Sequence, residues 1–339
     1  MNDPGRDTAA GFHEGELSVQ RRAGVARDAA RLTGMLAPAQ LGGGVTRFLA
    51  ERGFAAITAR DSEGTLWTSP LAGPPGFLHV ASPTALDVRA LPAEGDPLRG
   101  VLRDAPVPQP VGLIVVEFAT RRRLRVNGTL SRADGDGLRD GLRDGLRDGL
   151  RDGRRDGLRI DVEQAFGNCP QYIQARHLHA AAPRTAGGAE PVRRASTLNG
   201  ADADLIARSD TFLIGTTHPT RGNDASHRGG PPGFVRVEDG RLWWPDYWGN
   251  NMFNTLGNIQ SDPTAALLFC DFATGRTLHL SGDASVEWTD PGAPGDDDRT
   301  GRRVHFTPRH LVSGHLLPLQ ADSVTPARDN PPLTDRPAA

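Results

Sequence analysis

The chain has 339 residues, of which 37% are hydrophobic, and a formal net charge of −2 at pH 7. A charge this close to zero gives no general electrostatic case for binding nucleic acid or an anionic membrane. The sequence contains no lysine, which excludes lysine Schiff-base chemistry and leaves arginine and backbone N–H groups to hold any phosphate.

The length suits two domains, each with its own core. No stretch is apolar enough for a signal peptide or a membrane span, so we expect a cytoplasmic protein. Cys169 and Cys270 have no metal-ligand spacing around them, and we expect free thiols and no metal site.

In the first half, polar and alanine-rich residues 14–36 predict a helix, and residues 45–51 predict a second, shorter helix. Short apolar or alternating runs separated by Gly, Pro and Asp then predict an antiparallel β-barrel. These runs are residues 54–59, 66–68, 77–80, 111–118, 124–130 and 158–162.

Residues 137–157 repeat Gly-Leu-Arg-Asp, which is poor helix and poor strand, so we interpret them as an expanded loop. In the second half, a helix is expected at residues 251–260. The strands expected there are residues 211–216, 233–237, 242–244, 265–271, 277–280 and 285–288, followed by a last strand around residues 304–306.

Two strings of the first half recur in the second half. The pentapeptide Gly-Pro-Pro-Gly-Phe begins at Gly73 and again at Gly230, and each copy is followed at nearly the same distance by a Phe-Ala-Thr string, at residues 117–128 and 271–282. Two ordered matches at similar spacing indicate a tandem duplication.

The copies differ at a candidate phosphate site. Aligned on the pentapeptide, Ser69 matches Ser226, but Leu71 stands where the second copy has Arg228. A hydroxyl and a guanidinium two residues apart in a Gly/Pro turn can grip a phosphate, although a surface salt bridge would also explain the arginine.

Residues 243–258 of the second copy are rich in aromatic and carboxamide side chains. Aromatic faces can stack on a planar ring, and asparagine can bond at its edge. Trp243 and Trp244 could equally belong to the core, and Asn250 or Asn258 could cap the helix.

Residues 226–235, Pro245-Asp246, Gly249-Asn250, residues 255–258 and residues 278–282 resemble the pyridoxamine 5′-phosphate oxidase-related flavin-binding family, in its branch with a Ser-x-Arg-Gly turn. The resemblance implies a split β-barrel that binds FMN between two barrels, usually in a homodimer. The cofactor-binding residues that it implies are Ser226, His227, Arg228, Gly229, Phe234, Pro245, Asp246, Asn250, Asn251, Met252, Arg276 and Thr277. The substrate-binding C-terminal segment of the vitamin B6 oxidase has no counterpart, so that activity is not implied.

Together, the duplication and the resemblance predict an intrachain pseudo-dimer with one FMN site, formed mainly by the second copy, and an empty mirrored site at Leu71. The expected function is an FMN-dependent oxidoreductase on a small substrate, reduced by NAD(P)H or a separate reductase, in a monomer or homodimer. A non-catalytic flavin module, or a deazaflavin or haem barrel, remains an alternative. The domain limits expected are an arm at 1–40, a degenerate barrel at 41–180 with the loop 134–158, a linker at 181–197, the FMN-binding barrel at 198–320 and a disordered tail at 321–339.

Overall fold

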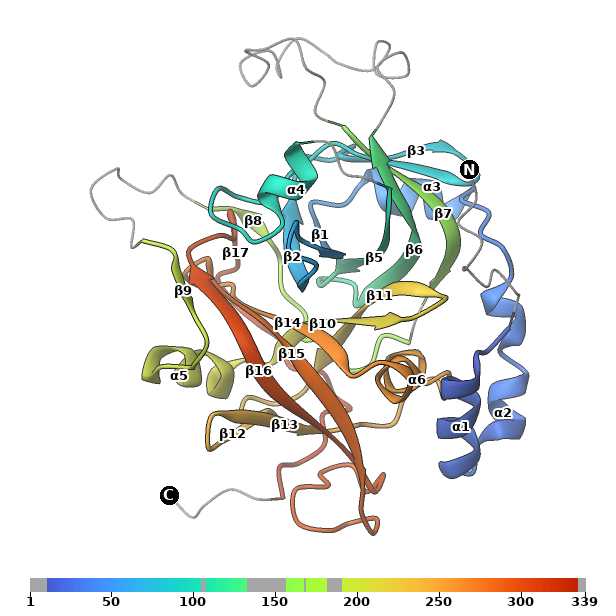
Figure 1. The fold of residues 1–339 in the computed structure, drawn as a ribbon, viewed down its shortest axis with the longest axis vertical. Helices are drawn as coiled ribbons and strands as arrows, with labels where there is room; N and C mark the ends of the chain where they lie inside the picture. The colour runs from blue at the N-terminus through green and yellow to red at the C-terminus, as the bar shows by residue number, and fades with distance from the viewer. Residues whose placement is uncertain (1–10, 105–107, 133–156, 168, 182–190, 335–339) are drawn as a thin grey trace.

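The structure is a computed structural model that describes residues 11–104, 108–132, 157–167, 169–181 and 191–334. Two curved antiparallel sheets dominate it, one above the other in Figure 1. The first sheet has the strand order β2-β1-β5-β6-β7-β4-β3, and the second has the order β11-β10-β14-β15-β16-β13-β12, with β9 added beside β16. The orders agree strand for strand, as a tandem duplication predicts, and each sheet is open rather than a closed barrel.

The first sheet consists of β1 (Phe54–Arg60), β2 (Leu66–Ala72), β3 (Leu78–Ser82), β4 (Ala85–Val88), β5 (Gln109–Glu117), β6 (Arg122–Arg132) and β7 (Leu158–Gly167). The second consists of β9 (Arg193–Ala195), β10 (Thr211–His218), β11 (Gly222–Gly229), β12 (Arg236–Glu238), β13 (Arg241–Pro245), β14 (Thr264–Asp271), β15 (Arg276–Trp288) and β16 (Arg302–Gly314). A small ribbon pairs β8 (His179–Ala180) with β17 (Leu319–Gln320).

The strand predictions hold for most of this list, with three differences. β4, β8, β9 and β17 were not expected because they are only two to four residues long, and β11 was not expected because its sequence is polar. The strands expected at 277–280 and 285–288 are one strand, β15, whose register shifts at a bulge between Ser281 and Gly282. The last strand, β16, is 13 residues long rather than three.

The helices are short. The single helix expected over residues 14–36 is wrong: the chain forms α1 (Glu14–Arg22), α2 (Ala26–Ala30) and the 3-10 helix η1 (Thr33–Leu36). Gly24, at φ +73°, separates α1 from α2 because a left-handed residue cannot continue a right-handed helix. The other helices are α3 (Gly44–Ala50), α4 (Arg99–Arg103), α5 (Gly200–Arg208) and α6 (Asn254–Ser261).

The central strands are buried on both faces, and their alternate residues serve two cores. In β1, Ala55 and Ile57 face the core inside the first sheet, whereas Phe54 and Ala56 face a core between the two sheets. In β10, Phe212 and Ile214 face the core inside the second sheet, and Leu213 faces the shared core. The shared core joins the two halves into one packed unit.

The sheets pack through equivalent strands. β11 lies against β5 and β6 of the first sheet, and β2 lies against β14 and β15 of the second. The approach is close: a Cβ on Gly112 would lie 2.5 Å from the Ala225 nitrogen, and a Cβ on Gly215 would lie 2.3 Å from Thr58 Cγ2. Glycine is therefore required where the strands cross.

Residues 321–334 differ from the disordered tail that was expected. They run back along the molecule, where Thr325 and Ala175 exchange backbone hydrogen bonds and Leu333 packs on the core of the second sheet. The repeats at 137–157 lie almost entirely outside the described residues, and the other domain limits stay predictions. Among the described residues, no helix is long and apolar enough to cross a membrane.

Candidate functional site

Ser226 and Arg228 lie at the end of β11, where this strand crosses β6 of the other sheet. They were expected in a turn, but the turn begins only after Gly229. A strand directs alternate residues to one face, and on this face Arg125 of β6 bonds to Ser226, while Arg123 lines the same cavity as Arg228.

The Ser226 hydroxyl joins two of these arginines. Arg125 Nη2 donates to Ser226 Oγ at 2.6 Å, and Arg228 Nη1 donates to the same oxygen at 3.2 Å. Among the hydrogen bonds of the described residues, this hydroxyl only accepts, so its own proton remains available to an acceptor.

Arg125 also forms the buried ion pair of the site. Its Nη1 lies 3.2 Å from Asp224 Oδ2, and Asn127 Nδ2 donates to Asp224 Oδ1 at 3.1 Å. Burial nevertheless raises the pKa of Asp224, and Arg125 opposes that rise only in part.

His227 points to the opposite face of β11, into the region between the sheets. Arg123 Nη1 donates to its Nδ1 at 3.0 Å, and since a guanidinium cannot accept, the ring proton must lie on Nε2. Burial, then the charges of Arg123 and Arg228, hold the pKa of His227 well below its usual value. The ring is therefore neutral.

Positive charge exceeds negative charge where the sheets meet. Burial, followed by repulsion from Arg125 and Arg228, lowers the pKa of Arg123 to about 9. Burial also lowers the pKa of Arg228. The negative charge of Asp246 opposes this lowering, and Asp246 Oδ2 also accepts from Arg302 Nε at 2.9 Å. Such a cluster of guanidiniums favours an anion between them.

Two small cavities meet at Arg123, Arg228 and Asp246, with volumes of about 80 and 60 Å³. Of the predicted residues, the first cavity is lined by Asn250, Asn251 and Met252, and the second by His227, Gly229, Phe234 and Pro245. Pockets for drug-sized ligands begin at about 300 Å³. The donors fit a phosphate, whereas neither cavity, which the loop 246–253 borders, is large enough for a flavin ring.

That loop has an unusual backbone. Asn251 has φ +61° and Phe253 has φ +58°, and a bulky residue costs roughly 1 kcal/mol or more in this region. Trp248, 45% exposed, stands at its outer side. Trp244 is a core residue with a face on the second cavity, and Asn258 bonds to Thr216 rather than capping a helix.

A larger cavity of about 960 Å³ lies between the β1–β2 and β10–β11 hairpin tips. Its lining has no counterpart of the arginine cluster. We therefore locate the site by its charges rather than by volume.

Arg276 and Thr277 lie apart from the other predicted site residues. Arg276 Nη2 donates to Asp202 and to Ser313, and Thr277 Oγ1 donates to the Gly314 carbonyl oxygen at 3.2 Å. Both lie on β15, which packs against β2, whereas β11 packs against β5 and β6.

Arg123 and Arg125 are the site residues that sequence reasoning missed. Strand register makes Arg123 the counterpart of Thr277, and Arg125 the counterpart of His279. The aligned repeats could have identified Arg123 and Arg125. A site between two barrels combines Ser226 and Arg228 of one copy with the facing strand of the other copy.

The mirrored position, between β2 and β15, is filled by side chains. Leu71 is fully buried in the core of the first sheet. Beside it, Ser69 Oγ donates to Asp96 Oδ1 at 2.6 Å, and His279 lies 3.7 Å from the other Asp96 oxygen. Among the described residues, this face has no arginine cluster.

The family comparison matches a segment of the second half. Residues 198–299 match the family model described as pyridoxamine 5′-phosphate oxidase. The similarity to this family therefore lies within the second half of the chain. This match confirms the resemblance that the sequence predicted.

A search of curated proteins found no match. Similar solved structures include a variant of HupZ from Group A Streptococcus, at 10% identity over 34% of this chain and 98% of that chain, with a TM-score of 0.28. A putative pyridoxamine 5′-phosphate oxidase from Lactobacillus delbrueckii matches at 14% identity over 34% and 93%, with a TM-score of 0.28. An F420 reductase matches at 15% identity over 32% and 93%, with a TM-score of 0.26.

Proposed function

We propose that the protein binds one FMN per chain between β6 and β11 and acts as a flavin-dependent oxidoreductase on a small substrate. The observation that carries the proposal is the convergence of Arg123 and Arg125 from the first copy with Ser226 and Arg228 from the second. A phosphate would offset the mutual repulsion of these arginines, and one of its oxygens would accept a hydrogen bond from the Ser226 hydroxyl.

The chain's residues would hold the two ends of the cofactor. Arg228 and Ser226 would bind the phosphate, while Arg123 and Arg125 would add positive charge. The carboxamides of Asn250 and Asn251 would meet the polar edge of the ring. Because the cavities are too small for the ring, this contact would require the loop 246–253 to move outward. FMN itself supplies the hydride or electron transfer when bound, so the site does not need a dedicated acid–base pair.

The match of residues 198–299 to the pyridoxamine 5′-phosphate oxidase family supports a flavin as the ligand. We propose that NAD(P)H or a separate reductase supplies the electrons. We also propose that the two copies replace the homodimer of relatives, whether the chain itself is a monomer or a dimer.

Titration of the purified protein with FMN, followed by flavin fluorescence, tests the proposal. One FMN per chain is expected, and two would contradict the asymmetry of the two interfaces. An absorption spectrum characteristic of a deazaflavin or a haem would replace FMN as the cofactor. A bound flavin that neither NADH nor NADPH reduces, and that passes no electrons to an acceptor, would indicate a flavin-binding module without catalysis.

A further inference from the structure

The N-terminal helix α1 lies directly against α6, the helix that follows the loop of the candidate site (Figure 1). The two backbones touch at glycines: a Cβ on Gly15 would lie 2.2 Å from the Gly257 carbonyl oxygen, and a Cβ on Gly257 would lie 2.6 Å from Glu16 Cγ. This close crossing inserts Glu16 between the helices, where it is 2% exposed.

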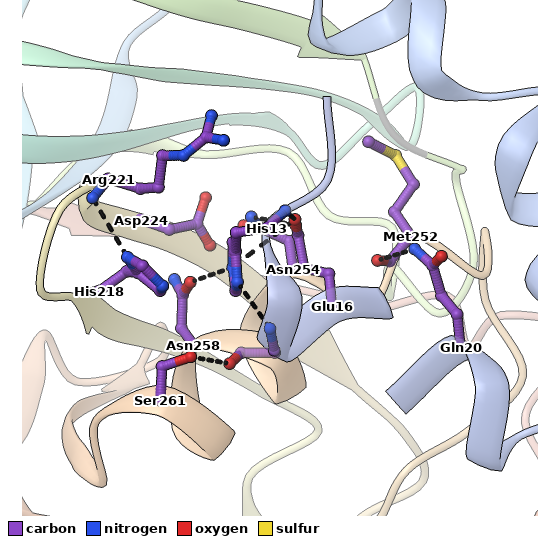
Figure 2. Close-up of polar contacts among 12 residues, drawn as sticks. His13, Glu16, Gln20, His218, Arg221, Asp224, Met252, Asn254, Asn258 and Ser261 are labelled. Carbon is purple, nitrogen blue, oxygen red and sulfur yellow. Dashed lines mark hydrogen bonds and ion pairs between the residues drawn. The ribbon is translucent and has the colours of Figure 1, made fainter. Parts of the chain in front are cut away.

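Glu16 has defined partners on both carboxylate oxygens. Oε1 accepts from Asn254 Nδ2 at 2.9 Å, and Oε2 accepts from the His13 backbone nitrogen at 2.9 Å. The second bond belongs to the capping box that starts α1. Figure 2 shows His13, Glu16, Asn254 and Asn258 grouped between α1 and α6.

Asn254 connects this carboxylate to the arginine cluster. Its Oδ1 accepts from Arg125 Nη1 at 2.9 Å, while its Nδ2 donates to Glu16. A guanidinium only donates and a carboxylate only accepts, so the two neighbours together allow one orientation of the amide. Arg125 in turn holds Ser226 Oγ, the oxygen that Arg228 also contacts.

Burial also shifts the pKa values of Glu16 and of its neighbour His13. Burial raises the pKa of Glu16 to about 7, with a smaller contribution from Asp224, while Arg221 and the hydrogen bonds from Asn254 and His13 oppose the rise. Burial lowers the pKa of His13 to about 4, and its neighbour His218 adds to that shift. His13 is therefore neutral, and it donates from Nε2 to Asn258 Oδ1, since its Nδ1 accepts from the Gly15 nitrogen.

We propose that Glu16 is a positioning residue of the phosphate site, which acts through Asn254 to orient the Arg125 guanidinium. The N-terminal helix is then part of the binding machinery rather than a peripheral arm. This inference rests on the proposed function, because it assigns Arg125 to the phosphate of FMN.

The test compares Glu16→Ala with Glu16→Gln and with Glu14→Ala. Glutamine keeps an oxygen for Asn254, and Glu14 is an exposed glutamate of the same helix that pairs with Arg21. Affinities are measured for FMN and for riboflavin, which lacks the phosphate. We expect Glu16→Ala to weaken FMN roughly tenfold without changing riboflavin. Glu16→Gln should restore most of the loss, and Glu14→Ala should have no effect.

An unchanged FMN affinity in Glu16→Ala would overturn the inference and leave the proposed function intact. An equal loss for FMN and riboflavin would also overturn it, because it would reveal only a loosened helix. Should Glu16→Ala fail to fold, Asn254→Ala breaks the same connection and carries the same expectations.

If the unaltered protein binds no FMN, the proposed function fails, and titration with inorganic phosphate decides the inference. Weaker phosphate binding in Glu16→Ala would support it. Unchanged binding, or no phosphate binding by the unaltered protein, would overturn it.

Discussion

The β6–β11 interface and the β2–β15 interface are formed by equivalent strands of the two copies, but their side chains differ in charge. At the first, Arg123 and Arg125 face Ser226 and Arg228 around two cavities. At the second, their counterparts are Thr277, His279, Ser69 and Leu71, and the space is closed by buried side chains. Each copy therefore supplies one half of the candidate site, and the equivalent half of the other copy lacks these side chains.

This complementary loss teaches how a duplicated barrel can become asymmetric. In a homodimer, one surface serves two equivalent sites, so a substitution alters both. In a fused chain each surface contributes to one site only, so a substitution alters that site alone. The β2 surface can therefore become apolar while β11 keeps its arginine, and β15 can lose its cations while β6 keeps them.

Arg228→Leu places at the β6–β11 interface the residue that stands at the equivalent position, Leu71, of the β2–β15 interface. Of the changes considered, it should have the largest effect on FMN binding. We expect FMN affinity to fall about a hundredfold, because the substitution removes charge-assisted donors to the phosphate. Fluorescence titration measures the change. Arg276→Leu is the matched control and should leave FMN affinity unaltered, since Arg276 lies on the strand facing β2. Equal losses in the two variants would contradict the assignment of the site.

Asp96→Ala probes the closed interface. Ser69 and the Leu98 N–H would lose their shared acceptor in a buried setting, which should lower the free energy of unfolding by about 2 kcal/mol. Urea unfolding measures this loss, with the exposed Asp28→Ala as control. FMN affinity should not change, and a parallel loss of binding would mean that the second interface also takes part in the site.

Arg123→Thr gives β6 the residue that β15 carries at the equivalent position. We expect about a tenfold loss of FMN affinity, since one cation leaves the cluster while Arg125 and Arg228 remain. Thr277→Val alters the mirrored residue and should not affect binding. If Arg123→Thr binds FMN as the unaltered protein does, the first copy contributes less than its geometry indicates.

The smallest effect is expected in the pH dependence of stability. Because the folded-state pKa of Glu16 is raised from 4.5 to about 7, its contribution is present below about pH 4.5 and lost as the pH rises toward 7. The pKa of His13 is lowered from 6.5 to about 4, so its contribution is present above pH 6.5 and lost as the pH falls toward 4. The two trends oppose each other between these values.

Glu16→Gln removes the first trend. The free energy of unfolding of this variant should therefore rise more steeply with pH across the window than that of the unaltered protein. Urea unfolding at several pH values checks the slope. Identical slopes would show that Glu16 keeps an ordinary pKa.

Local strings predicted much of the fold, and they also supplied the residues of the second copy that the proposed site uses. The alternating apolar runs identified most central strands, because their residues are buried on both faces. β11 was missed, since its sequence from Gly222 to Gly229 is polar and contains two glycines. Its burial comes from packing against β5 and β6 rather than from its own hydrophobicity.

The sequence by itself determined the duplication and the mainly β class, because each depends on residues that are neighbours in the chain. Only the tertiary structure placed Ser226 and Arg228 in a strand, and it decided that Arg123 and Arg125, rather than Arg276 and Thr277, lie beside them. It alone also brought Glu16 to Asn254 and closed the mirrored site with Asp96 and His279. These contacts join residues far apart in the sequence, and they depend on how the two sheets cross.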